Sequence, residues 1–152
     1  MPRHRLAAAL LFAACLAGCD GGNGDRGAGS RWEGPPEPAA DGSVSVEEFA
    51  GHEADVDEAW ERSSATAAAE FLRVDEAVAA RLTIDRTAPG EGGGPETVVV
   101  TLDGLFDDSV RAERWTLVLE PEDGAYVLTS AARALRCQAG RGHEDFSAEP
   151  CL

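Results

Sequence analysis

The strongest constraint on the fold is a change in hydrophobic period near Ala79. Before it, apolar residues recur at intervals of seven, four, seven and four, as on one face of an α-helix. These residues are Phe49, Val56, Trp60, Ala67 and Phe71. After Ala79, apolar and polar residues alternate, which is typical of half-buried β-strands. The sequence therefore predicts a helical first part followed by a β-sheet.

The helical part carries its own start and stop signals. Ser45 and Glu48 fit a capping box, with Ser45 as the N-cap and Glu48 as the third helical residue. Ser63 and Ser64 are candidates for a break into two helices, because serine side chains compete for backbone hydrogen bonds. We expect the apolar face of this part to lie in the core.

Four strands are expected after the helical part, over 79–85, 97–102, 110–120 and 125–131. Leu82 and Ile84 should give the first strand one buried face. Short connections, such as the turn around Asp123 and Gly124, favour an antiparallel meander packed on one side by the helix. The predicted class is α+β, with an N-terminal helix on a four-stranded antiparallel sheet. In outline this is similar to small cystatin-like or NTF2-like domains.

The N-terminus is typical of an export signal. Basic residues precede an apolar run from Leu6 that is too short to span a bilayer. The following Leu16-Ala17-Gly18-Cys19 resembles the lipobox of bacterial lipoproteins. The resemblance implies a diacylglyceryl group on the Cys19 sulfur and cleavage just before Cys19. The simpler alternative is an ordinary signal peptide, with Cys19 present by chance.

The same resemblance implies a location. A lipid on Cys19 would anchor the protein to the outward, periplasmic face of a cell membrane, since two or three acyl chains anchor stably. Asp20 resembles the signal that retains lipoproteins in the inner membrane of enteric-type envelopes. That rule is not general among bacteria, so the outer membrane stays open as an alternative.

Three segments follow from these signals. Residues 1–18 are the expected signal peptide, and 19–43 are the expected lipidated, flexible tether. The tether is rich in glycine and proline, and Trp32 is its one large apolar side chain, which we expect to be solvated. Such a coil would span roughly 25–30 Å. Residues 44–152 are the expected single α+β domain.

The composition excludes some classes of function. The formal net charge is −15 and the chain contains no lysine. So acidic a protein repels nucleic-acid phosphates, and lysine-based catalysis is excluded. No dinucleotide-binding or other catalytic motif is recognised, and no cofactor is expected. Asp103, Asp107 and Asp108 lack the spacing of a calcium loop and are expected to cap turns.

Two cysteines remain after the signal and the lipid site, Cys137 and Cys151. In an exported protein such a pair favours a disulfide. The alternative is a metal site that adds His143, but a fourth ligand is not evident. We therefore expect no metal.

The tail after Arg136 is polar and glycine-rich, and it carries Arg141 and His143 as candidate binding residues. Roughly the last 50 residues resemble small exported bacterial proteins of uncharacterised function, which implies no activity. We predict a non-catalytic module that binds a partner or ligand. The alternatives are a structural accessory of an envelope complex and a small enzyme that uses His143.

Overall fold

The computed structural model describes residues 31–87, 89–90 and 93–152. The expected signal peptide, the lipobox with Cys19, and Asp20 lie outside these residues. None of the described helices is long and apolar enough to cross a membrane.

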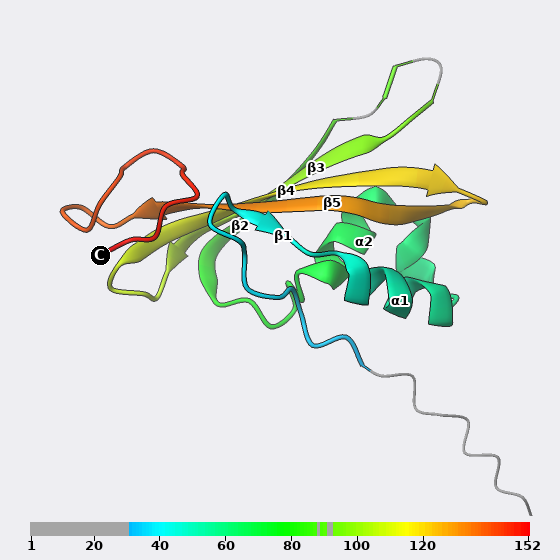
Figure 1. Ribbon diagram of the computed structural model, residues 1–152, viewed down its shortest axis with the longest axis horizontal. Coiled ribbons are helices and arrows are strands. Elements are labelled where there is room, and N and C mark those ends of the chain that lie inside the picture. The colour runs from blue at the N-terminus through cyan, green and yellow to red at the C-terminus, as the bar shows by residue number, and fades with distance from the viewer. Residues whose placement is uncertain (1–30, 88, 91–92) are drawn as a thin grey trace, which may run out of the picture.

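The described chain folds into one antiparallel sheet with helices on one face (Figure 1). The helical elements are α1 (Glu47–Asp55), the 3₁₀ turn η1 (Ala59–Arg62) and α2 (Ser64–Phe71). The strands are β1 (Ser43–Val44), β2 (Ala79–Thr87), β3 (Glu96–Leu105), β4 (Val110–Glu122) and β5 (Ala125–Cys137). Their order across the sheet is β1-β5-β4-β3-β2.

The α+β class and the antiparallel meander are therefore confirmed, but the predicted detail was wrong. The sheet has a fifth strand, because Ser43 and Val44 pair with β5 at Ala132 and Ala131. The helical part forms two α-helices, the division for which Ser63 and Ser64 were candidates, and not one continuous helix. The β4–β5 turn forms as expected, since Asp123 and Gly124 have positive φ angles of 48° and 89°. This geometry gives a tight hairpin.

The helix boundaries also differ from the prediction. α1 begins at Glu47 without a side-chain cap, so the capping box at Ser45 was wrong. The helical part is interrupted at Ser63, as proposed, and also earlier, after Asp55. Acidic side chains gather at this earlier break, and the negative end of the helix dipole disfavours them there.

The core lies between the helices and the middle strands. Phe49, Ala67 and Phe71 from the predicted apolar face are fully buried, whereas Val56 and Trp60 are half-buried. The sheet contributes Val98, Val100, Leu117, Leu119 and Leu128. The helices thus cover β3, β4 and β5.

Trp32 is part of this core, so the expectation of a solvated tryptophan was wrong. Its side chain is 6% exposed, and its ring centroid lies 5.7 Å from that of Phe71. The indole N–H donates to the Phe71 carbonyl oxygen at 2.8 Å, and Arg73 donates to the Trp32 carbonyl oxygen at 2.6 Å. The later part of the expected tether therefore packs on α1 and α2.

The predicted half-buried face of β2 was also wrong. Leu82 and Ile84 are 43% and 37% exposed, although they pair with the buried Leu102 and Val100 of β3. Their side chains point to the helix-covered face of the sheet. The helical layer does not extend far enough to cover them, so alternation here does not produce burial.

Candidate functional site

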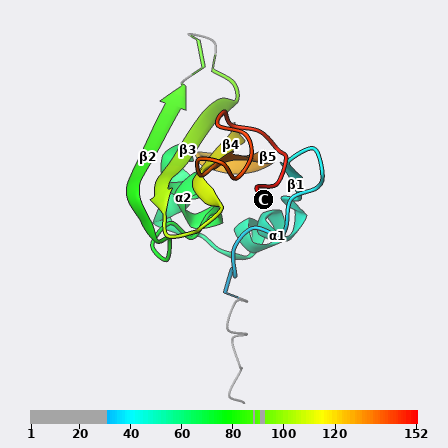
Figure 2. The ribbon, with the colours of Figure 1, turned by 90° about the vertical axis from the view of Figure 1, so that its left-hand side faces the viewer.

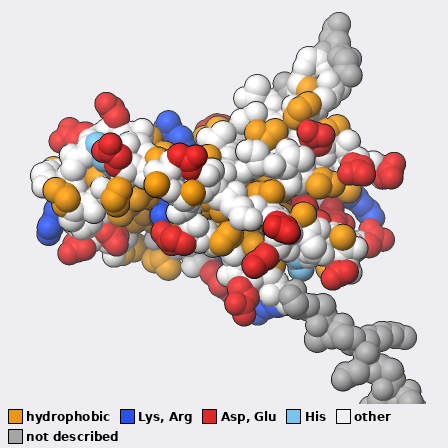
Figure 3. Space-filling view, in the orientation of Figure 1, with side chains coloured by type: hydrophobic (Ala, Val, Ile, Leu, Met, Phe, Trp, Pro, Cys, Tyr) orange, Lys and Arg blue, Asp and Glu red, His pale blue; other side chains and the backbone are white. Residues whose placement is uncertain are grey.

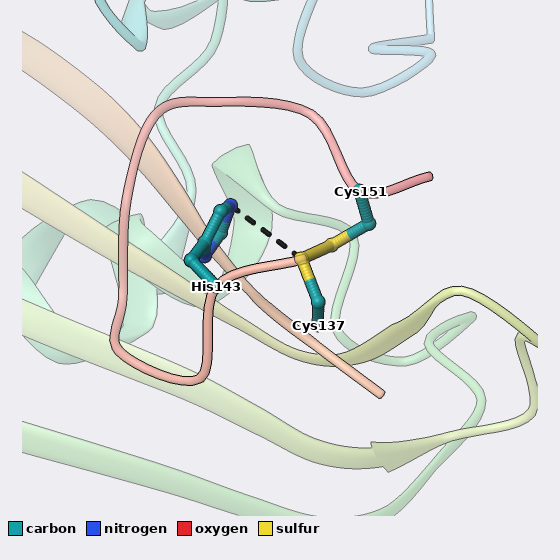
Figure 4. A group of neighbouring side chains, drawn as sticks. All are labelled: Cys137, His143 and Cys151. Carbon is teal, nitrogen blue, oxygen red and sulfur yellow. Dashed lines mark hydrogen bonds between the residues drawn. A yellow bond between two sulfur atoms is a disulfide. The ribbon is translucent and has the colours of Figure 1, made fainter. Parts of the chain in front are cut away.

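The polar tail forms a closed loop at one end of the sheet (Figure 4). Cys137, the last residue of β5, is joined to Cys151 by a disulfide, and their Cα atoms are 5.5 Å apart. This is the pairing favoured by the sequence. The loop also adds a short antiparallel contact to β5, in which Leu135 pairs with Ser147.

His143 points into this loop (Figure 4) and is half-buried. Its Nδ1 lies 2.8 Å from the Asp145 carbonyl oxygen, and its Nε2 lies 2.8 Å from the Glu149 carbonyl oxygen. Because carbonyl oxygens only accept, both contacts are satisfied together only when both nitrogens carry protons. The Glu149 carbonyl, followed by the Asp145 carbonyl, raises the pKa of His143 above its usual value.

These contacts allow His143 to hold two parts of the loop together. Both of its ring nitrogens are engaged by the protein's own backbone, and Cys137 Sγ lies 3.5 Å from Nε2. None of these contacts is to a nucleophilic hydroxyl. Arg141, the second candidate binding residue, is exposed, and its backbone N–H donates to the Gln138 carbonyl oxygen.

In the alternative metal site the three candidate ligands lie close together, but the two cysteines are already joined in the disulfide. Ligand atoms of Cys137, His143 and Cys151 lie within 4.8 Å of one another. A metal would require two thiolates, whereas the disulfide removes both. The three candidate calcium aspartates do not converge either. Asp107 accepts from the Ser109 and Val110 N–H groups, and Asp103 accepts from Arg136.

A groove that the sequence did not predict lies between residues 31–36 and α1. Its volume is about 690 Å³. Trp32, Pro36 and Val56 provide apolar surface, and acidic side chains line it together with Arg31 and His52; these acids are Glu33, Glu48 and Asp55. His52 is half-buried and stacks on Trp60 at 6.0 Å, rather than lying free on the helix surface.

A buried carboxylate lies on the opposite side of α1. Glu53 is 8% exposed; one of its oxygens accepts from the Leu128 N–H at 3.3 Å, and the other has no hydrogen-bond partner. Burial, and to a lesser degree the nearby Glu61, raises the pKa of Glu53 to about 7, against the effect of the Leu128 N–H. Sequence reasoning missed this group because acidic residues are common on α1.

A second buried carboxylate, Glu96, is fully partnered. It accepts from the Ser64 hydroxyl and, at 2.8 Å, from the Tyr126 hydroxyl. The Ser64 hydrogen bond is the main reason that the pKa of Glu96 is lowered. Ser64 is fully buried, so a substrate cannot reach its hydroxyl. This cluster ties α2 to the sheet.

Acidic side chains are spread over the molecule, and the space-filling view shows them at both of its ends (Figure 3). No family model, curated protein or solved structure matches this chain.

Proposed function

We propose that this protein is a lipid-anchored envelope module that binds a ligand or partner and performs no chemistry itself. The observation that supports binding is the groove beside α1. It combines apolar surface from Trp32 and Val56 with three carboxylates. Such a lining suits a positively charged molecule with an apolar body, for example a basic peptide.

The tail loop is a weaker candidate for the binding site. His143 uses both ring nitrogens within the loop, which also counts against the alternative of an enzyme built on His143. Membrane attachment through a lipid on Cys19 rests on the lipobox resemblance. The outward face and the inner membrane are proposed on the same ground, from Cys19 and Asp20.

Gly51 allows a direct test of the groove. It lines the groove within α1, and a Cβ atom added there meets no other atom within 4 Å. Gly51→Trp should therefore fill the groove without disturbing the fold. The matched control is Ala54→Trp, at an exposed position of the same helix that does not line the groove.

The full-length protein and both variants would be captured from membranes and their bound molecules identified by mass spectrometry. We expect Gly51→Trp to lose a molecule that the parent protein and Ala54→Trp retain. If all three proteins retained the same bound molecule, the groove would not be its binding site. Recovery of one stoichiometric protein partner would support the alternative of a structural accessory in an envelope complex.

Cys19→Ser tests the anchor separately. We expect it to abolish incorporation of a labelled fatty acid and to slow removal of the signal, because the sulfur is the acyl acceptor. An unlabelled parent protein would contradict the lipoprotein proposal without affecting the groove.

A further inference from the structure

The two edges of the sheet differ in how far other described parts of the chain cover them. Three sets of contacts cover the β5 edge along its length. The Glu53 carboxylate meets the Leu128 N–H, β1 pairs with Ala131 and Ala132, and the tail loop accepts from the Leu135 and Cys137 N–H groups at 2.7 and 3.0 Å. Exposed edges invite pairing with other chains, and proteins usually block them.

The opposite edge, β2, has no such cover among the described residues. β2 pairs only with β3, and almost all of its nine residues are exposed. Figure 2 shows β2 at the margin of the sheet, outside the helices. Leu82 and Ile84 add an uncovered apolar face to the unpaired backbone. An edge of this kind can take an added strand.

The sequence of β2 is complementary to itself. When two copies run antiparallel about a two-fold axis at Thr83, Arg81 of each lies opposite Asp85 of the other, and Leu82 lies opposite Ile84. Opposite charges placed directly across two strands attract, and the apolar pairs share one face. Moving the axis by one residue in either direction places Arg81 opposite a threonine instead.

We propose that β2 is the dimer interface of this protein, with a second copy of the chain as the added strand in this register. The two sheets then form one continuous antiparallel sheet, and the exposed Leu82 and Ile84 of each copy shield those of the other. This is an isologous contact, as expected for a two-fold dimer. The charge pairs fix the register, since rim charges contribute more to specificity than to affinity.

The acidic net charge opposes this association. Both copies carry a formal charge of −15, so their mutual repulsion favours the monomer at low ionic strength. Salt screens this long-range repulsion, and the apolar pairs are insensitive to it. Dimerisation should therefore strengthen when salt is raised from about 10 to 150 mM, over which the Debye length falls from roughly 30 to 8 Å.

A single cysteine at the axis tests the geometry. Thr83 meets Thr83 of the second copy, and directly opposed residues of antiparallel strands are at disulfide distance. The full-length Thr83→Cys variant, oxidised in membranes, should give a covalent species of twice the chain mass. The control is Thr116→Cys, exposed on the same face of the sheet but on β4, together with the parent protein with its native cysteines.

A charge exchange tests the register. Asp85→Arg places arginines opposite each other and should weaken the dimer about tenfold, measured by sedimentation equilibrium of the full chain in non-ionic detergent. Combining Arg81→Asp with Asp85→Arg restores opposite charges and should recover the affinity. Recovery by the double variant would not be expected if either change acted by unfolding β2.

Three outcomes would overturn the proposal. The first is a parent protein that stays monomeric at all salt concentrations, with no Thr83→Cys dimer. The second is a Thr83→Cys cross-link to a different protein, which would make the added strand foreign. The third is a monomer whose outward-facing β2 amide groups, those not bonded to β3, are protected from hydrogen exchange, which would show that another part of the same chain covers this edge.

Discussion

The Glu53 carboxylate accepts a hydrogen bond from the Leu128 backbone N–H and so joins α1 to the outer edge of β5. The contact blocks an edge position that would otherwise attract another strand. It also buries an ionisable group, whose second oxygen has no hydrogen-bond partner. The same residue therefore protects the sheet and makes its stability depend on pH.

The pH dependence follows from the raised pKa of Glu53. The pKa is about 7 in the fold against a usual 4.5, so the fold favours the protonated acid. The stabilisation is complete below pH 4.5 and is lost as the pH rises through 7. We expect Glu53→Gln to unfold less readily than the parent at pH 8.5, by about 1–3 kcal/mol, with little difference at pH 5.

Urea unfolding at the two pH values measures this difference. Glu47→Gln, an exposed carboxylate of the same helix, is the control and should leave the pH dependence unchanged. If Glu53→Gln kept the parent's pH dependence, Glu53 would not be the group that titrates.

The pKa of His143 is raised as well, and it predicts a second, local effect. The two carbonyl oxygens favour the protonated imidazolium form of His143. The stability that this form adds to the loop is therefore complete below the pKa of histidine in the unfolded chain, near 6.5, and is lost as the pH rises through the pKa of His143 in the fold. An NMR titration of the His143 ring should give a midpoint above 6.5. A midpoint below this value would mean that the ring does not donate to both carbonyl groups.

Trp32 is expected to contribute strongly to stability. Trp32→Ala removes a buried ring from between Phe49 and Phe71 and should cost about 3–5 kcal/mol. Trp32→Phe keeps most of the packing and loses the hydrogen bond to the Phe71 carbonyl group, which should cost about 1–3 kcal/mol. Denaturant midpoints measure both values, and Arg31→Ala should be nearly neutral. A neutral Trp32→Ala would mean that residues 31–43 do not pack on the helices.

The disulfide predicts both a mass and a stability change. Intact Cys137–Cys151 lowers the chain mass by about 2 Da relative to the reduced form. The cysteines are 14 residues apart, a loop whose closure is worth about 3 kcal/mol in the chain-entropy model. The double serine variant should lose up to that amount in thermal unfolding. Two free thiols or bound zinc in the exported protein would defeat the assignment.

Local patterns were sufficient for the class of the fold. The alternation after Ala79 and the Asp123–Gly124 turn indicated strands and a hairpin, because both depend on neighbouring residues. The pairing of Cys137 with Cys151 followed from counting cysteines. The burial of Phe49 and Phe71 followed from their period.

The rest depends on contacts between distant residues. Trp32 stands alone in a glycine- and proline-rich segment, so no period marks it as part of the core. Leu82 and Ile84 alternate like buried residues, but alternation does not show whether a helix lies above a strand. The buried state of Glu53 depends on Leu128, which lies 75 residues away. The groove beside α1 forms only where residues 31–36 lie next to that helix, and no local pattern indicates that they do.

The burial of Trp32 would also limit how far the domain stands from a membrane to which Cys19 anchors it. With lipid on Cys19, as proposed, 12 residues separate the anchor from the packed Trp32, whereas 23 separate it from Ser43. A flexible coil of the shorter length reaches roughly 20 Å. Every copy would then be confined to a thin layer above the bilayer. In such a layer the local concentration is high, so two β2 edges that meet weakly in dilute solution would meet often.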